Sequence, residues 1–145
     1  METSANVLPG FKIMIVDDNE FYTKILSGFL KSNLNKLAII KGFALNIISC
    51  TSFKCFTENM DNSVDLLFTD YYLNDGHNGS HIMDFIKHRA LKCKIVMVSQ
   101  VQTMQTSFLT SLAGTYEFVK KDEKTLFECN GIAETIIAEK LRLTN

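Results

Sequence analysis

The sequence predicts an α/β fold, a doubly wound parallel sheet of five strands with helices on both faces. Short apolar runs alternate with segments of helical periodicity five times along the 145 residues, and such alternation is typical of parallel sheets covered by helices. Several of the runs are apolar throughout, as expected for strands that are buried on both faces. No linker or repeat interrupts the pattern, and the length suits one domain.

The predicted strands are rich in branched and aromatic residues and are bounded by turn residues. They cover residues 11–16, 45–50, 64–70, 93–98 and 116–119. The third run, Leu66-Leu67-Phe68-Thr69, ends abruptly at Asp70. Because a carboxylate inside a buried strand is costly, we expect Asp70 at the carboxyl end of the strand, where open α/β sheets place their ligand sites.

The first helix is expected to begin after a cap at Asp18 or Asn19, with Glu20 in its first turn. Helical spacing predicts that four apolar residues face the sheet: Phe21, Ile25, Phe29 and Leu30. Residues 37–40 either continue this helix or form a separate turn before Gly42.

The remaining helices are shorter or weaker in pattern, except for the last. Ser52 is the expected cap of a helix that runs to about residue 60, and Ser80 that of a helix over 81–89. A weak helix over 103–112 and a longer one over 124–141 complete the prediction. Residues 74–79 are predicted to form a loop from their composition.

Composition excludes several classes of function. The chain has 15 Lys and Arg against 16 Asp and Glu, a net charge of −1. It therefore lacks the excess of positive charge that is typical of nucleic-acid-binding proteins. No apolar run approaches the length of about 20 residues that spans a bilayer, and residues 1–6 do not resemble a signal peptide, so we expect a cytoplasmic protein. The four cysteines match neither zinc nor haem spacings and are expected to be free thiols: Cys50, Cys55, Cys93 and Cys129.

Polar residues follow four of the five predicted strands. These residues are Asp17, Asp18, Asp70, Ser99 and Lys120. Singly they have ordinary explanations, such as a helix cap, a turn or a solvated lysine pair. In a parallel sheet, however, their strand ends meet at one edge. Three crowded carboxylates need a cation, and oxygen ligands suit Mg²⁺ or Mn²⁺. A lysine and a hydroxyl beside the metal complete a site at which a carboxylate attacks a phosphoryl group.

From Lys12 to Leu141 the chain resembles the receiver domain of response regulators in two-component signalling. The segments that carry the resemblance are residues 13–20, 66–73, 96–99 and 118–120. The resemblance implies the flavodoxin-like, CheY-like strand order 2-1-3-4-5. It divides the chain into a flexible lead (1–10), a receiver domain (11–142) and a short tail (143–145).

The resemblance also implies roles for the residues at the sheet edge. Asp70 would be the phosphoacceptor. The metal would be held by Asp17, Asp18, Asp70 and the backbone carbonyl of Tyr72. Ser99 would turn toward the phosphoryl group, and Lys120 would pair with it.

The expected partners follow from the same resemblance. A sensor histidine kinase or a histidine phosphotransfer protein would donate the phosphoryl group, and a downstream protein would bind the surface from Gln102 to Val119. We expect neither direct nucleic-acid binding nor membrane association, and homodimerisation on phosphorylation is a further expectation. The protein would assist its own phosphorylation without being a dedicated enzyme.

Some residues depart from the pattern of the family. Lys121 stands where the family has a proline in a cis bond, so the Lys120–Lys121 bond is expected to be trans. A strict count places Glu117 where the family has an aromatic residue, with Tyr116 beside it. These departures favour an alternative, a pseudo-receiver that binds proteins without being phosphorylated.

Two further alternatives are weaker. A phosphohydrolase with Asp70 as its nucleophile would usually have a second acid two residues on, where Tyr72 stands. His77 and His81, four residues apart, are a candidate metal pair, but loop histidines are usually solvated.

Overall fold

The protein is a five-stranded parallel sheet with helices on both faces, as the sequence predicts. The computed structural model describes residues 7–100 and 115–144, and the predicted helix over 103–112 lies outside them. The sheet has the order β2-β1-β3-β4-β5, and all four strand pairs are parallel. The elements are β1 (Gly10–Val16), α1 (Glu20–Lys41), β2 (Ala44–Cys50), α2 (Phe53–Asn59), β3 (Leu66–Thr69), α3 (Gly79–His88), β4 (Lys94–Ser99), β5 (Glu117–Lys120) and α5 (Thr125–Thr144).

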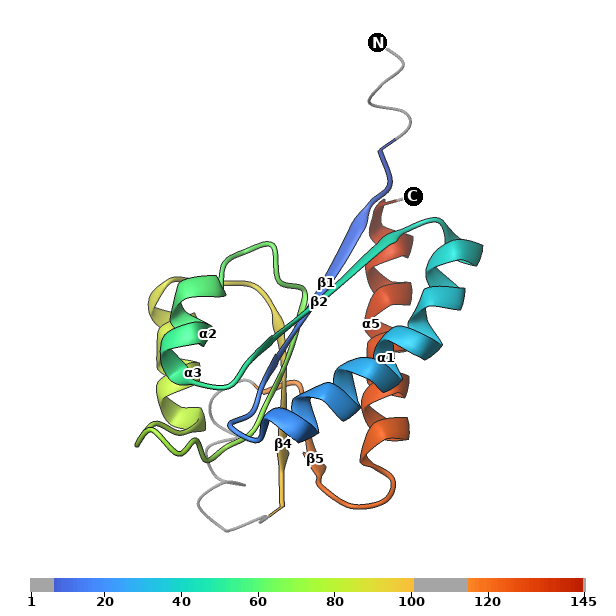
Figure 1. Cartoon of the computed structure of the whole chain (residues 1–145). Coiled ribbons are helices and arrows are strands. Elements are labelled where there is room, and N and C mark those ends of the chain that lie inside the picture. The colour runs from blue at the N-terminus through green and yellow to red at the C-terminus, as the bar shows by residue number, and fades with distance from the viewer. Residues whose placement is uncertain (1–6, 101–114, 145) are drawn as a thin grey trace.

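The helices form two layers, with α1 and α5 on one face of the sheet and α2 and α3 on the other (Figure 1). Alternate residues of each strand point to opposite faces. In β1, Ile13 and Ile15 therefore join the apolar cluster under α1 and α5, whereas Met14 and Val16 join the cluster under α2 and α3. Among the described residues, no helix combines the length and apolar character needed to cross a bilayer.

Helix α1 continues through residues 37–40 and is therefore one long helix. The side chain of Asn19 caps its start by accepting the Tyr22 N–H. Gly42 ends it in the left-handed region, at φ 75°, and donates its N–H to the Ala38 carbonyl. A side chain with a Cβ atom is disfavoured in this conformation, which explains a glycine at the end of the helix.

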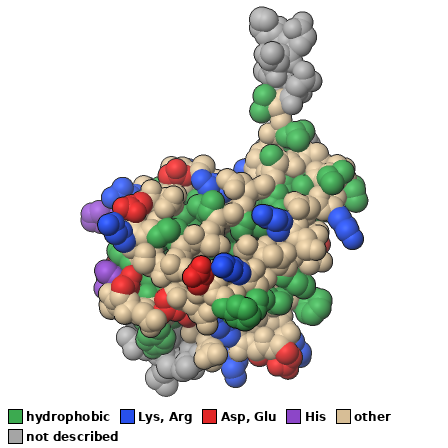
Figure 2. All heavy atoms as spheres, viewed as in Figure 1, with side chains coloured by type: hydrophobic (Ala, Val, Ile, Leu, Met, Phe, Trp, Pro, Cys, Tyr) green, Lys and Arg blue, Asp and Glu red, His purple; other side chains and the backbone are tan. Residues whose placement is uncertain are grey.

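The face of α1 that meets the sheet differs from the one predicted. Phe21 is 72% exposed and Ile25 is 39% exposed, so the prediction that they face the sheet was wrong. The buried residues repeat every three or four positions and are Thr23, Leu26, Leu30, Leu34 and Ala38. This stripe covers the whole helix, whereas the pattern of Phe21 and Ile25 does not continue beyond Phe29. Hydrophobic side chains consequently appear on the surface along α1 (Figure 2).

The caps of the two short helices agree with the sequence in one case and correct it in the other. Ser52 caps α2 by accepting the Cys55 N–H. Helix α3 begins two residues earlier than expected, at Gly79, and its cap is Asn78 instead of Ser80. Asn78 accepts the Ser80 N–H, and the ring of His81 accepts the Asn78 N–H in return. This reciprocal pair is a capping box, with histidine in the place usually taken by Glu or Gln.

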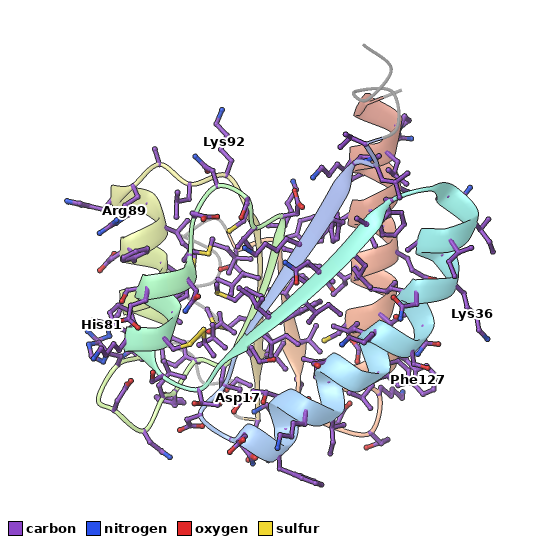
Figure 3. The ribbon with its side chains drawn as sticks, turned by 45° about the horizontal axis from the view of Figure 1, so that its top comes forward. Asp17, Lys36, His81, Arg89, Lys92 and Phe127 are labelled. Carbon is purple, nitrogen blue, oxygen red and sulfur yellow. A yellow bond between two sulfur atoms is a disulfide. The ribbon has the colours of Figure 1, made fainter. Side chains whose placement is uncertain are left out.

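A disulfide joins Cys50, the last residue of β2, to Cys55 in the first turn of α2. The expectation of free thiols was wrong for this pair, whereas Cys93 and Cys129 are free. The turn between β2 and α2 brings the two Cα atoms to 5.4 Å, within the range that a disulfide spans. Figure 3 shows the bridge beside α2. Closing so short a loop stabilises the fold by about 2 kcal/mol in the chain-entropy model.

Gly79, the first residue of α3, allows a close approach to the sheet. A Cβ atom there would lie 2.7 Å from Cδ2 of Tyr71 and 2.9 Å from Cε of Met97. The Met97 methyl group can move, but the Tyr71 ring is buried and cannot easily do so. We expect Gly79→Ala to lower the free energy of unfolding by about 1–3 kcal/mol, measured by urea denaturation.

Gly28 is the matched control, because it lies inside α1 and a Cβ atom there would meet nothing within 4 Å. Gly28→Ala should raise the free energy of unfolding by about 0.5–1 kcal/mol, since alanine favours a helix more than glycine does. Equal effects of the two substitutions would contradict the packing described for Gly79.

Candidate functional site

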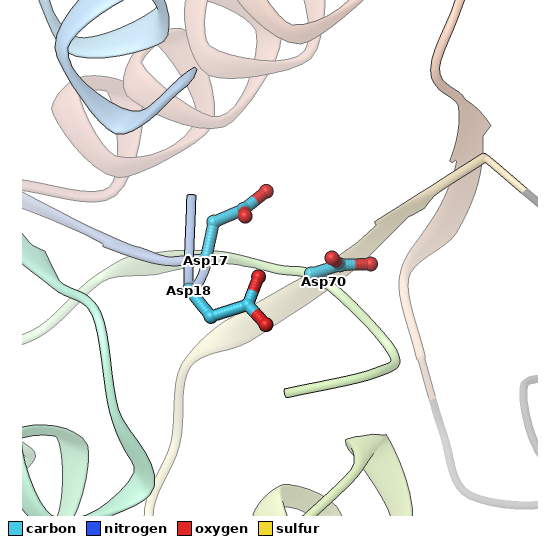
Figure 4. A group of neighbouring side chains, drawn as sticks. All are labelled: Asp17, Asp18 and Asp70. Atoms are coloured by element: carbon cyan, nitrogen blue, oxygen red, sulfur yellow. The ribbon is translucent and has the colours of Figure 1, made fainter. Parts of the chain in front are cut away.

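Three carboxylates converge at the carboxyl edge of the sheet. Asp17 and Asp18 follow β1, and Asp70 follows β3, the neighbouring strand. One oxygen from each lies within 4.8 Å of the others, and Figure 4 shows the three side chains around a common space. Asp17 is only 3% exposed, whereas Asp18 and Asp70 are half-buried. The structure therefore brings together the three acids that the sequence predicts to meet at this edge.

The strand ladders place the backbone of these acids. The Asp17 N–H donates to the carbonyl of Cys50 at 3.0 Å, and the Asp70 N–H donates to the carbonyl of Val16 at 2.8 Å. The pairing of β1 with β2 and with β3 thus continues one residue beyond the strands. Oδ1 of Asp17 also accepts the backbone N–H of Asn19 at 2.9 Å, which ties the buried acid to the start of α1.

Lys121 supplies the positive charge of the site. Its Nζ lies 2.5 Å from Oδ2 of Asp17 and 3.4 Å from Oδ2 of Asp70. The same ammonium group lies 4.3 Å from the ring centre of Tyr22 in α1, at a distance where a cation is attracted to an aromatic face. Lys121 therefore bridges the two acids, and its ammonium group is held by their carboxylates and by the ring of Tyr22.

This arrangement corrects the predicted lysine. Lys120 is exposed, and no contact of its side chain with the acids is present among the described residues. Side chains alternate along a strand. Val119 packs into the cluster under α1 and α5, so Lys121 lies on that side and Lys120 on the other. Phe118 and Val119 are both apolar, and the sequence therefore gave no signal for choosing between the two lysines.

A short turn holds Lys121 in place. The Lys120–Lys121 bond is trans, as expected, since the described residues contain no cis bond. The Lys121 N–H donates to the Ser99 carbonyl at 2.9 Å. The buried hydroxyl of Thr125 lies 2.8 Å from the carbonyl of Lys120 and accepts the N–H of Asp122 at 2.7 Å. Thr125, which the sequence analysis did not single out, thus closes the turn that carries the lysine.

Burial raises the pKa of the Asp70 carboxyl above its ordinary value. Lys121 opposes this shift, and the negative charge of Asp17 adds to it. The ionised Asp70 is therefore poorly solvated and only partly neutralised in this structure. A further cation would stabilise a carboxylate in this condition. Such a carboxylate is also a better nucleophile than one whose charge is fully neutralised by an ion pair.

The acids and Lys121 line a pocket of about 270 Å³. Ser99, at the end of β4, also lines it and is 2% exposed. Tyr72 and Gln100 form part of the wall. Ser99 and Tyr72 thus line the same pocket as Asp70. The role predicted for the Tyr72 carbonyl stays a prediction.

Tyr116 lies far from Ser99 along the sheet. Its N–H donates to the Ile95 carbonyl, and its ring lies 5.3 Å from Nζ of Lys94 at the first residue of β4. Glu117 pairs with Val96, and Ser99 pairs with Lys120. Neither Tyr116 nor Glu117 is therefore beside the Ser99 hydroxyl. Of the predicted partner surface, residues 102–114 lie outside the described residues.

The two loop histidines are engaged in contacts of their own. The ring of His77 stacks on Phe53 at 4.1 Å and pairs with Asp75, and Nδ1 of His81 accepts the Asn78 N–H. In the part of the chain that the structure describes, the acid cluster is the one group of three or more side chains placed to hold a metal. Neither His77 nor His81 belongs to such a group.

The donor set of the acid cluster fits a small, hard divalent cation. All three side-chain donors are carboxylate oxygens, which suit Mg²⁺ and Mn²⁺ and do not favour softer metals. The pocket that they line has room for bound water beside them, and Mg²⁺ usually keeps several waters. Asp17, Asp18 and Asp70 would hold such an ion.

Comparisons based on sequence identify no relative. No family model matches the chain, and no curated protein matches it. The structure, in contrast, is similar to many solved structures.

Three solved structures illustrate this similarity. A response regulator receiver domain protein (CheY-like) from Methanospirillum hungatei JF-1 has a TM-score of 0.67 at 19% identity, over 93% of this chain and 98% of that one. The signal receiver domain of a DNA-binding response regulator from Colwellia psychrerythraea 34H has a TM-score of 0.73 at 14% identity, over 88% and 98%. A response regulator receiver protein from Pseudoalteromonas atlantica has a TM-score of 0.73 at 15% identity, over 89% and 98%. The chain thus has the CheY-like fold of response regulator receiver domains.

Proposed function

We propose that this protein is a phosphorylation-controlled signalling switch in which Asp70 accepts a phosphoryl group with the help of Mg²⁺ or Mn²⁺. The observation that carries the proposal is the convergence of three carboxylates, a half-buried lysine and a hydroxyl on one pocket at the carboxyl edge of the sheet. The fold, shared with receiver domains, supports it.

The chemistry follows from the positions of the side chains. A carboxylate oxygen of Asp70 attacks the phosphorus, and the donor's bond to phosphorus breaks with its electrons remaining on the donor. A metal held by the three acids would neutralise charge on the phosphoryl oxygens. Lys121 is near enough to Asp70 to interact with the same oxygens once phosphate is attached, and Ser99 offers a hydroxyl from the pocket wall.

The switch itself would be a change in what Lys121 and Ser99 bind. Phosphorylation adds negative charge and acceptor oxygens at Asp70. Lys121 would then divide its interactions between Asp17 and the phosphoryl group. Since the Lys121 N–H is bonded to the Ser99 carbonyl, a movement of either residue affects the ends of both β4 and β5. This is a local change of charge coupled to a packed element.

The partners of such a switch are part of the proposal. The donor would be a sensor histidine kinase or a histidine phosphotransfer protein, and the target would bind the surface from Gln102 to Val119. The protein would act in the cytoplasm, as a phosphoacceptor and not as a dedicated enzyme, and phosphorylation would favour a homodimer.

One observation favours a second candidate, a pseudo-receiver that binds its partner without phosphorylation. The ammonium group of Lys121 already contacts both Asp17 and Asp70 and so replaces part of the charge that a metal would supply. The raised pKa of Asp70 shows that this neutralisation is incomplete, which favours the first candidate.

Phosphorylation of Asp70 is tested with acetyl phosphate and Mg²⁺, with intact mass spectrometry as the measurement. We expect the protein to gain one phosphoryl group, and chelation of the metal with EDTA to prevent the gain. Asp70→Asn should not react, because its side chain is not a nucleophile. Asp84→Asn, which changes an exposed aspartate of α3, is the control and should react as the unchanged protein does. Phosphorylation of Asp70→Asn would refute the assignment, and an unreactive wild-type protein would favour the pseudo-receiver.

The two lysines provide a matched pair for the same assay. Lys121→Ala should slow phosphorylation by about tenfold or more, because it removes the cation beside the reacting carboxylate. Lys120→Ala changes an exposed side chain and should alter the rate by no more than about twofold. The reverse ranking would show that Lys120, as the resemblance implied, is the functional lysine.

Stability measurements test the charge at Asp70 independently of the reaction. The folded-state pKa of Asp70 is raised, so the unfolded chain loses this proton first and stability falls as the pH rises through the folded-state pKa. Without metal, Asp70→Asn should therefore unfold at a higher temperature than the wild type at pH 7, and the difference should disappear below the unfolded-state pKa. Mg²⁺ should stabilise the wild type more than the variant. A less stable variant at pH 7 would contradict the charge balance described here.

A further inference from the structure

The disulfide lies next to the proposed phosphorylation site. Cys50 is 2% exposed and ends β2, and its carbonyl accepts the N–H of Asp17 at 3.0 Å. This hydrogen bond is the last link between β2 and the segment that carries Asp17 and Asp18. A residue joined to Cys55 by a covalent bond therefore positions the most buried acid of the pocket.

The position of β2 makes this link sensitive to the bridge. β2 is an edge strand and is paired on one side only, with β1. Its last residue is held by that pairing and by the bridge to α2. The strand end and α2 are also held together by apolar packing, because Cys50 lies in the same buried cluster as Phe56 of α2. Breaking the bridge would thus remove the covalent restraint on the end of β2 and leave the strand pairing and this apolar packing to hold it.

The first turn of α2 also contacts the segment that follows Asp70. The Phe53 N–H donates to Oδ2 of Asp75 at 2.8 Å, and the Phe53 ring stacks on His77. The bridge accordingly joins β2 to a turn that is already attached to the loop after β3. The first turn of α2 is therefore linked to the segment after β3 directly, and to the segment after β1 through Cys50.

We propose that Cys50 and Cys55 form a reversible redox site that controls how firmly Asp17 is held and, through Asp17, how tightly the pocket binds a divalent cation. The second part rests on the proposed function. In the oxidised form the bridge holds the end of β2 against α2 and keeps the Asp17 N–H bonded. In the reduced form the strand end opens more often, and the cation is bound more weakly.

The chemistry needs a thiol–disulfide partner and no other reactant. In oxidation, a small-molecule disulfide takes two electrons from the two thiols, one bond forms between Cys50 and Cys55, and two small thiols leave with the protons. In reduction, a small thiolate attacks Sγ of Cys55, the bond to Cys50 breaks, and Cys50 leaves as a thiolate that takes up a proton. A second small thiolate attacks the small-molecule sulfur of the mixed disulfide, which releases the Cys55 thiolate and a small-molecule disulfide. Cys55 is the point of attack because it is half-buried, whereas Cys50 is buried.

Hydrogen exchange of the Asp17 amide, followed by NMR on the metal-free full chain, tests the structural part. One sample is oxidised with glutathione disulfide, and the other is reduced with a phosphine. The amide should exchange about 3- to 30-fold faster in the reduced sample. The Asp70 amide, bonded to the Val16 carbonyl between two inner strands, is the internal control and should change little. Equal exchange of the Asp17 amide in the two samples overturns the proposal.

Titration of the same two samples with Mg²⁺ tests the functional part. The reduced protein should bind Mg²⁺ about threefold or more weakly. Cys55→Ser should behave as the reduced protein under both conditions. Cys93→Ser, which removes a free thiol outside the bridge, should keep the redox response.

Equal Mg²⁺ affinity in both states overturns the redox control and leaves the proposed function standing. No Mg²⁺ binding in either state contradicts the proposed function as well, so the two failures are distinguishable.

Discussion

The ion pair between Lys121 and Asp17 is the interaction on which the site depends. Asp17 is buried at the end of β1, and a buried carboxylate without a partner would be strongly unfavourable. Lys121 comes from the far end of the chain and reaches Asp17 because β1 and β5 run parallel and end at the same edge. The pair therefore links the outer part of the sheet to the strand that carries two of the three acids.

The same pair sets the electrostatic state of Asp70. Burial raises the pKa of its carboxyl, and Lys121, which lies nearer to Asp17 than to Asp70, offsets this only in part. In the proposed function, added positive charge or added phosphate would each change which groups Lys121 contacts. Ser99 and Tyr72 complete the walls around it.

Backbone hydrogen bonds connect the pocket to neighbouring elements. Asp17 is bonded to the end of β2, Asp70 to β1, and Lys121 to the end of β4. The chemistry of the side chains thus depends on how the ends of all five strands are aligned. The disulfide acts on one of these alignments from outside the pocket, and Thr125 acts on another by closing the turn after β5.

The sequence by itself determined the alternation of strands and helices and the acids that follow β1 and β3. These features depend on local patterns, namely apolar runs and the polar residues that end them. The strand order, inferred from the resemblance, is confirmed by the structure. Only the tertiary structure decided that Lys121 and not Lys120 enters the pocket, which face of α1 is buried, and that Cys50 pairs with Cys55. The physical reason is that each of these choices depends on which side of an element faces its neighbour, and adjacent residues of similar character give no local signal of that direction.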